Sequence, residues 1–416
     1  MKLSVARIVR VLNRHPRAKY ALYRAVDAGI ACAARCGLDI RRRRTAFTRT
    51  RHRSIGLPLE WLPARNSTAR ATHWIEVDPP HDVVVRGPTA YSDVEDSPYS
   101  ALWHMVTRGY TLNACDILEL RDGRFHLPSG LVAAGGRFPS ETISLDGFPY
   151  RWQYVDCMRT LWAPSRRMAD GFLLTLHQSA NYYHWVCEVL PLAYALMRDA
   201  RWGTLPVYVS ADLPEFVFEY LRMLGLEGYC RALPHGVYSA DTLLVPTFPG
   251  GSEWPSPDHL CTVRRACLEA VGPSLQARRR LYISRADAAE RRVVNETELM
   301  ATLADLGFER VTLTGMSPAD QIRLFQTADI VLAPHGAGTT NILFAPPDCL
   351  LIELMGPGFV STCFMVVASA VGQRYGYVRC DERDRDLVVD TAAARRVVDD
   401  LIRARCTPPA RPYQPS

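Results

Sequence analysis

The chain has 416 residues, more than one typical domain, so two core-forming domains are expected. Hydrophobic residues make up 48% and charged residues 22%, the ordinary balance of a soluble globular protein. The net charge of +6 is uneven: residues 1–53 carry +13, and the rest therefore carries −7. Since no nucleic-acid-binding module accompanies the basic segment and the body is acidic, we expect no nucleic-acid partner.

The N-terminal segment is predicted to be helical over 3–14 and 19–37, and an arginine run follows at 41–44. Apolar residues share one face of the first helix, with arginines away from it. A basic amphipathic helix beside a polybasic run suits an anionic membrane surface; a solvated helix packed on the body is the alternative. No apolar stretch approaches the roughly 18 residues of a membrane span, and arginines interrupt the one candidate signal-peptide core. The expected location is cytoplasmic, with residues 1–53 peripheral on the inner face of the membrane.

The twelve cysteines are scattered and form no Cys-x-x-Cys pair. They lie in apolar segments, as Cys187, Cys349 and Cys363 do, which is typical of small buried side chains in a reducing compartment. The ligand spacing of a structural zinc site is missing.

From about 54 to 165 short alternating segments predict strands and turns. After that, strands and helices alternate, which indicates a parallel, doubly wound sheet. The expected strands are 171–178, 205–210 and 242–247, and the expected helices are 181–199, 215–226 and 258–271.

The alternation continues in the C-terminal part. A helix is predicted over 296–307, opened by Asn295 with Glu298 three residues on, as in a capping box. Ser317 and Pro318 start another helix, with proline at the tolerated first position. The expected strands are 279–285, 310–315, 328–334 and 349–355. Two Rossmann-like halves with a boundary near 258–278 are the simplest arrangement.

The loop His335-Gly336-Ala337-Gly338 follows the predicted strand 328–334 and precedes a short helix predicted over 339–345, which includes Asn341. Ligands of open α/β sheets bind at the carboxyl ends of strands, and a helix N-terminus attracts phosphate. His335, the two glycines, Ala337 and Asn341 are therefore candidate phosphate-binding residues. Glu353, late in the next strand, is a candidate partner of ribose hydroxyls. A tight turn with His335 packed in the core is the alternative.

The resemblance to a known family rests on an ordered set of segments: "YISR", "RRVVNETEL", "LGFERVTL" and "SPADQIRLFQTADIVLAPHGAGTTNILFAPPDCLLIEL". Over about 170–356 the chain closely resembles the catalytic domain of family 61 glycosyltransferases, which include bacterial capsular-polysaccharide-type enzymes, plant xylosyl- and arabinosyltransferases and eukaryotic O-linked N-acetylglucosaminyltransferases. One departure is Thr339, where the family usually has an apolar residue.

The resemblance implies a GT-B-like α/β fold, in which two Rossmann-like domains face each other across a cleft. It also implies a nucleotide-sugar donor held mainly by the C-terminal domain, and inversion at the anomeric carbon without an obligatory metal. The expected limits are a basic helical segment at 1–53, an acceptor-side domain at 54–265 whose Rossmann-like core begins near 170, and a donor-binding domain with a C-terminal helix at 266–416.

Without a metal, protein cations and helix dipoles must neutralise the leaving diphosphate. Arg285, at the end of its predicted strand, is the best-placed candidate, followed by Arg291 and Arg292, although either of the latter suits an exposed surface equally well. The Asp-x-Asp pair Asp384 and Asp386 lies in the charged run "DERDRD" and is expected to be a solvated loop.

His184 and Glu188 are four residues apart on one predicted helical face. A carboxylate beside an imidazole fixes its tautomer and raises its basicity, as a general base requires. The same stretch, "NYYHWVCEVLP", resembles the family's N-terminal-domain signature. A packed core histidine with a surface glutamate is the alternative, and the base is either His184 or a carboxylate elsewhere.

The sequence thus predicts an inverting, metal-independent glycosyltransferase of hexosyl or pentosyl type. UDP is the expected nucleotide because of the resemblance. The acceptor is expected to be a saccharide or glycolipid hydroxyl in surface polysaccharide, such as capsular polysaccharide, or in another glycoconjugate. A non-catalytic nucleotide-binding scaffold is the first alternative. A dinucleotide-dependent oxidoreductase is weaker, because Gly336 and Gly338 are not followed by the third glycine of G-x-G-x-x-G.

Overall fold

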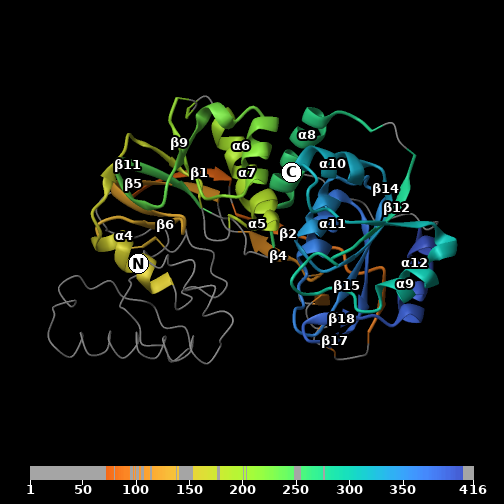
Figure 1. The fold of residues 1–416 in the computed structure, drawn as a ribbon. Coiled ribbons are helices and arrows are strands. Elements are labelled where there is room, and N and C mark those ends of the chain that lie inside the picture. Colours follow the sequence, from red (N-terminus) through yellow and green to blue (C-terminus); the bar gives the residue numbers. More distant parts are fainter. Residues whose placement is uncertain are drawn as a thin grey trace.

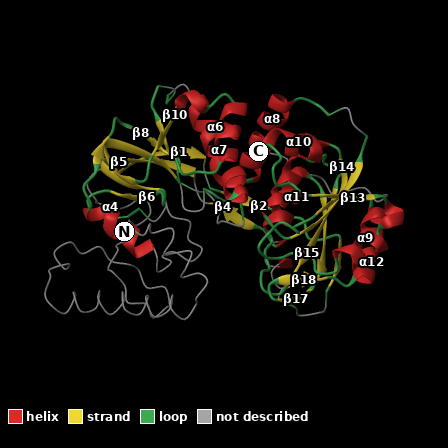
Figure 2. Ribbon diagram, in the orientation of Figure 1, coloured by secondary structure: helices red, strands yellow, loops and turns green. Residues whose placement is uncertain are grey.

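The computed structural model describes residues 72–405, apart from 79, 94–96, 98, 100–102, 105–106, 113–114, 137, 140–152, 176–178, 200, 203, 248–253 and 275–276. The predicted basic segment 1–53 lies outside the described residues. Figures 1 and 2 show two lobes side by side, each built on its own sheet and each combining helices with strands. The mixed α/β class and the parallel sheet predicted from the sequence are confirmed.

The first sheet has the order β1-β5-β11-β8-β9-β10, with β6 beside β5 and β7 beside β11. Its pairs from β11 to β10 are parallel as predicted, but β1, β5 and β11 pair antiparallel. The strands are β1 (Thr72–Asp78), β5 (Cys115–Leu127), β6 (Leu131–Ala133), β7 (Arg166–Arg167), β8 (Gly171–Leu173), β9 (Val207–Ser210), β10 (Cys230–Leu233) and β11 (Gly236–Pro246).

The second sheet has the order β13-β12-β14-β15-β16-β3, and every pair in it is parallel. Its strands are β3 (Ala90–Ser92), β12 (Arg279–Ile283), β13 (Phe308–Val311), β14 (Ala328–Pro334), β15 (Leu350–Met355) and β16 (Arg374–Arg379). β14 and β15 are almost wholly buried, as expected of a sheet covered on both faces. The edge strand β3 comes from a segment far upstream, expected from the sequence in the first domain.

Two further pairs of short strands are antiparallel: β2 (His81–Val83) with β4 (Tyr110–Leu112), and β17 (Asp381–Arg383) with β18 (Asp386–Val388). The helices are α4 (Gln153–Trp162), α5 (Tyr182–His184), α6 (Leu190–Arg198), α7 (Glu215–Met223), α8 (Pro257–Val271), α9 (Glu296–Thr302), α10 (Pro318–Gln326), α11 (Cys363–Val371) and α12 (Thr391–Ala404). Irregular helical turns are the π-helix η3 (Trp185–Val189) and the 3-10 helices η4 (Glu227–Tyr229), η5 (Ala304–Leu306) and η6 (Ala337–Phe344).

Helices cover both faces of the second sheet. On one face α9 and α12 pack against Ile330 and Ile352, and on the other α10, η6 and α11 pack against Val331 and Leu351. The core on the second of these faces also includes Trp185 and other residues of the first lobe, and α8 contacts helices of both lobes. The two sheets are therefore joined through one continuous apolar core.

Several local predictions need correction. The helix predicted over 296–307 ends at Thr302 and continues as the 3-10 turn η5, and the predicted helix 339–345 is the 3-10 helix η6. Asn295 does not form the predicted capping box, because its side-chain oxygen accepts from the backbone N–H of Val389 and not from the helix. Its Nδ2 donates to the carbonyl of Val389 and to the carboxylate of Glu298. The Ser317 cap is confirmed, since its hydroxyl accepts from the backbone N–H of Asp320. Cys187, Cys349 and Cys363 are buried, as predicted.

No helix in the described part of the chain combines the length and apolar character needed to cross a membrane.

Candidate functional site

The strand order of the second sheet creates a switch point between β12 and β14. The chain leaves β12 toward α9 on one face and leaves β14 toward η6 on the other. In open parallel sheets the crevice beyond such a pair of strand ends is the usual place for a ligand. Arg285 follows β12 and His335 follows β14, so two of the predicted phosphate-binding residues lie at this point.

Gly336 gives space to the guanidinium of Arg285. A Cβ atom at Gly336 would lie 2.0 Å from Nη1 of Arg285, a distance at which the arginine would have to move. The backbone of Gly336 is extended, so glycine is needed here for space and not for its conformational freedom. The guanidinium is held from the other side, where Nη2 donates to the carbonyl of Glu290 at 3.1 Å. Burial, and then the charge of Arg291, lower the pKa of Arg285, so an anion placed beside it would relieve an unfavourable environment.

His335 belongs to a buried hydrogen-bonded chain with Glu353 and Tyr375. Nδ1 of His335 bonds to one carboxylate oxygen of Glu353, and the hydroxyl of Tyr375 donates to the other at 2.7 Å. Glu353 is 0% exposed and His335 only 6%. Burial, followed by the charge of Glu353, raises the pKa of Tyr375, which keeps its hydroxyl a donor. Because the carboxylate accepts at Nδ1, that nitrogen carries a proton and Nε2 is the ring atom left for a ligand.

The geometry bears directly on the predicted ribose role of Glu353. Both of its carboxylate oxygens are already hydrogen-bonded within the protein, and its side chain has no exposed surface. In this arrangement Glu353 orients His335 and presents nothing to a ribose.

A separate cavity of about 260 Å³ lies near the carboxyl ends of β15 and β16. Phe359, Arg291 and Glu382 are among its lining residues. The ring of Phe359 is 4.8 Å from that of His335, and the guanidinium of Arg291 lies 5.0 Å from the Phe359 ring centroid. The carboxylate of Glu382 accepts from the backbone N–H of Gly358 at 2.7 Å. The cavity is thus adjacent to His335 and contains an acidic group that the sequence did not single out.

The other predicted arginines have different surroundings. Arg292 is paired with Asp386, with 2.5 Å between its Nη2 and a carboxylate oxygen, so its charge is already partnered. Asp384 lies at the turn of the β17–β18 hairpin with φ of 51°, as a turn residue would, but Asp386 is buried against Arg292 and is not part of a solvated loop. This pairing lowers the pKa of the Asp386 carboxyl. Among the described residues, no group of three or more His, Cys, Asp or Glu side chains is placed to hold a metal ion.

Asn341 is fully buried and its amide is used within the protein. Its Oδ1 accepts from the hydroxyl of Tyr182 at 2.8 Å, and its Nδ2 donates to Gln321 at 2.7 Å and to the carbonyl of Gly338 at 3.1 Å. Tyr182 also shares a hydrogen bond with Tyr220. In place of a phosphate contact, Asn341 therefore connects η6 of the second lobe to α5 of the first.

Thr339, at the position where the family usually has an apolar residue, is buried within η6. It is 1% exposed, and its hydroxyl turns back to the carbonyl of Pro334 at 3.5 Å. The departure from the family pattern is thus absorbed inside η6 without a polar group facing the candidate site.

His184 and Glu188 form the predicted pair. Nδ1 of His184 lies 3.0 Å from a carboxylate oxygen of Glu188, and both side chains are 14% exposed. The pair spans the junction of α5 with the π-helix η3, a local irregularity that is frequent at functional sites. Figure 1 shows α5 between the two sheets, and α5 contacts η6.

A chain of ring contacts joins the two histidines. His335 contacts Phe364 at 5.1 Å, Phe364 contacts Tyr183 at 5.6 Å, and Tyr183 contacts His184 at 5.3 Å. Tyr183 and Trp185 are buried in the core rather than presented to a sugar. The histidine of each lobe thus lies at one end of a packed aromatic path across the boundary.

Residues 182–352 match the family model described as Glycosyltransferase 61. The matched segment is thus similar to the glycosyltransferase 61 family. It contains His184, Arg285 and His335 together with the whole switch point, and the resemblance inferred from the sequence is confirmed.

Two plant relatives match shorter stretches. The beta-1,2-xylosyltransferase XAX1 of Oryza sativa subsp. japonica is 36% identical over 78 residues, which is 18% of this chain and 13% of the relative. A beta-1,2-xylosyltransferase of Arabidopsis thaliana is 35% identical over 63 residues, which is 15% of this chain and 12% of the relative. The aligned stretches thus span only a small part of these curated relatives, so the similarity is local.

Proposed function

We propose that this chain is an inverting glycosyltransferase that moves a sugar from a nucleoside diphosphate, expected to be UDP, to a hydroxyl acceptor. The observation that carries the proposal is the meeting of Arg285 and His335 at the switch point of the parallel sheet, inside the family 61 segment. A GT-B-like cleft between the two lobes is part of the proposal.

In this proposal Arg285 and Nε2 of His335 contact the diphosphate of the donor. As the sugar–oxygen bond breaks, negative charge grows on the departing phosphate, and preorganised donors in a water-poor site stabilise it best. Glu353 and Tyr375 act through His335, since they hold its ring with Nε2 available to the ligand. Arg291 reinforces the positive potential from the rim of the adjacent cavity.

The nucleoside is assigned to the cavity beside His335. The half-exposed ring of Phe359 offers apolar surface to a base, and Glu382 offers a carboxylate to ribose hydroxyls. This gives Glu382 the role that the sequence suggested for Glu353. The cavity volume of about 260 Å³ lies just below the usual range of small-molecule sites.

The first lobe supplies the base in this mechanism. His184, oriented by Glu188, takes the proton of the acceptor hydroxyl as its oxygen attacks the anomeric carbon. The bond from that carbon to the diphosphate oxygen breaks on the opposite side, so the configuration inverts and the nucleoside diphosphate leaves. Glu188 stabilises the imidazolium that forms.

The test is a calorimetric titration of the full chain with UDP, GDP, CDP and NAD, each with and without EDTA. We expect UDP to bind, to keep its affinity in EDTA, and to lose it in Arg285→Ala and His335→Ala. A panel of UDP-sugars would then identify the donor by release of UDP. Preference for NAD, or no nucleotide binding by a folded protein, would overturn the proposal.

The acceptor is proposed to be a saccharide or glycolipid of a surface polysaccharide or other glycoconjugate. Membrane association through the basic residues 1–53 remains a prediction. Deletion of this segment should reduce sedimentation with anionic vesicles, and unchanged sedimentation would contradict it.

A further inference from the structure

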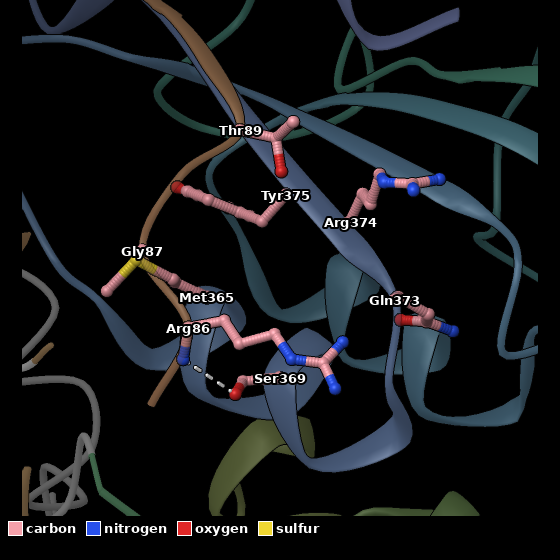
Figure 3. Close-up of a pocket in the computed structure, with 8 residues that line it drawn as sticks. All are labelled: Arg86, Gly87, Thr89, Met365, Ser369, Gln373, Arg374 and Tyr375. Atoms are coloured by element: carbon pink, nitrogen blue, oxygen red, sulfur yellow. Dashed lines mark hydrogen bonds between the residues drawn. The ribbon is translucent and has the colours of Figure 1, made fainter. Parts of the chain in front are cut away.

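A second cavity, of about 290 Å³, lies away from the switch point (Figure 3). Arg374 and Gln373 at the start of β16, Ser369 of α11, and Arg86 and Thr89 of the segment leading into β3 line it. Because the strands of the second sheet are parallel, the start of β16 is at the edge opposite to that with Arg285 and His335. The cavity is therefore distinct from the proposed donor site.

Gln373 presents a buried acceptor in this cavity. Its side chain is 2% exposed, and its Nε2 faces three carbonyl oxygens, of Ile342, Ala345 and Pro346, at 3.0–3.2 Å. These acceptors fix the orientation of the amide, because the amide oxygen could not take that place. Oε1 is consequently turned away from them, and it has no hydrogen-bond partner in the described part of the chain.

Arg86 presents a buried donor in the same cavity. Its backbone N–H donates to Oγ of Ser369 at 2.9 Å, and its Nη1 donates to the carbonyl of Gly372 at 3.3 Å, so both its backbone and its guanidinium are held by neighbouring groups. Its Nη2 is buried and has no partner among the described residues. Figure 3 shows the guanidinium of Arg86 and the amide of Gln373 extending from different segments into one space.

We propose that this cavity binds a neutral sugar unit of a glycan. A sugar hydroxyl accepts a hydrogen bond and donates one, so vicinal hydroxyls would satisfy Nη2 of Arg86 and Oε1 of Gln373 together. The buried Tyr375 and Met365 supply aromatic and apolar walls for the C–H faces of the ring.

A sugar fits these groups better than an anion does. The guanidinium of Arg86 is already turned to the carbonyl at the C-terminus of α11, and the cavity adds the amide oxygen of Gln373. Both oxygens would repel a phosphate or carboxylate. A neutral hydroxyl can be bound without an opposing oxygen being left unpaired.

The volume exceeds that of a lone water. Each water takes about 30 Å³ of liquid, so the cavity of about 290 Å³ is far larger than one bridging water needs. Its volume is just below the usual lower limit of small-molecule pockets, about 300 Å³, and suits a ligand as small as one sugar ring. The inference stands on this cavity alone and does not depend on the proposed transferase activity.

The test is saturation-transfer NMR on the full chain with methyl glycosides and oligosaccharides of xylose, glucose, galactose and mannose, followed by calorimetric titration of those that bind. Thr89 is exposed at the cavity, so Thr89→Trp fills the entrance without removing a buried bond. Arg86→Met removes the donor. Val84→Trp, on the same segment at a side chain 73% exposed and outside the cavity lining, is the matched control.

We expect saccharide affinity to fall about tenfold or more in Thr89→Trp and Arg86→Met and to stay unchanged in Val84→Trp. Saturating UDP and the His335→Ala substitution should leave it unchanged, which separates this site from the donor site. Melting curves verify that each variant is folded. Binding that survives both cavity variants, displacement by phosphate or sulfate, or no saccharide binding by the folded wild type would overturn the proposal.

Discussion

The two sheets differ in how their strands are buried and in which groups they carry. In the second sheet every pair is parallel and helices cover both faces, so its apolar runs are continuous and its strand ends meet at one edge. In the first sheet a long antiparallel pair, β5 with β11, is joined to a short parallel part. The parallel sheet positions Arg285 and His335 on loops at a common edge, whereas the first lobe contributes His184 and Glu188 from a helix.

This difference implies a division of labour between the lobes. Groups at the carboxyl edge of the second sheet should govern nucleotide affinity, and the helical pair of the first lobe should govern turnover. The shared core and the contact of α5 with η6 keep the two sets in one arrangement. Substitutions in each lobe should therefore separate nucleotide affinity from turnover.

The largest effect is expected at His184. His184→Ala should lower the rate of transfer by about 10²- to 10⁴-fold, the usual contribution of a positioned base, while UDP affinity changes little. Glu188→Gln should give a smaller loss of rate, because Glu188 acts through the imidazole of His184. Initial rates of UDP release and calorimetry with UDP would measure the two quantities. A parallel fall in UDP affinity would contradict the division.

A smaller effect is expected at Gly336. In Gly336→Ala the new Cβ would lie within 2.0 Å of Arg285 Nη1 if nothing moved, so the arginine must leave its place. We expect UDP affinity to fall about tenfold or more, as when one charge-assisted contact is lost.

Gly228→Ala is the matched control for this substitution. Its added Cβ meets nothing within 4 Å, and Gly228 is in the first lobe. Calorimetric titration with UDP compares the two variants. Equal affinities would show that the position of Arg285 does not matter for the nucleotide.

The same contrast explains what the sequence could predict. The apolar runs that became β14 and β15, and the Ser317 cap of α10, were readable because the signals are local. Arg285 and His335 were found together because the rule about parallel strand ends turns two distant loops into neighbours. In a parallel sheet, an apolar strand segment and the loop that follows it are therefore enough to predict that two such loops lie close together.

Contacts between residues far apart in the sequence could not be predicted from local sequence patterns. β3 is three residues long and pairs with β16 across more than half the chain, and no periodicity marks such a strand. The buried carboxylate of Glu353 accepts a hydrogen bond from Tyr375 of the next strand. The amide oxygen of Asn341 accepts one from Tyr182 of the other lobe. Glu382 lies in a charged run, and its contact with the backbone of Gly358, at the cavity, has no signal in the sequence.

The boundary between the lobes can be tested at Tyr182. Its hydroxyl bonds both Tyr220 and Asn341 at 2.8 Å, and burial raises its pKa, so it remains protonated. Tyr182→Phe leaves a buried carbonyl oxygen of Asn341 without this donor, and we expect the free energy of unfolding to fall by about 2 kcal/mol. Tyr91→Phe, at a ring 46% exposed, is the control. Denaturant unfolding followed by fluorescence would measure both; equal stabilities would mean that the core alone joins the lobes.

The smallest effect is expected from a histidine of the first sheet that has no part in the proposed chemistry. Burial, and then the charges of His235 and Arg159, lower the pKa of His126 on β5 to about 4. Because the unfolded chain binds this proton near pH 6.5, stability should fall as the pH drops toward 4, by about 1.4 kcal/mol between pH 8 and pH 5.5 from this group alone.

Unfolding free energies at the two pH values, for wild type and His126→Gln, would isolate this contribution. The variant should lose less stability on acidification by about that amount, because it has no imidazole to protonate on unfolding. His104→Gln, at an exposed histidine, controls for removal of an imidazole as such. If both variants lose as much unfolding free energy as the wild type between the two pH values, the burial of His126 does not shift its pKa. Since His126 is remote from the switch point, UDP affinity should not follow this stability change, which would separate the acid sensitivity of the first sheet from ligand binding at the second.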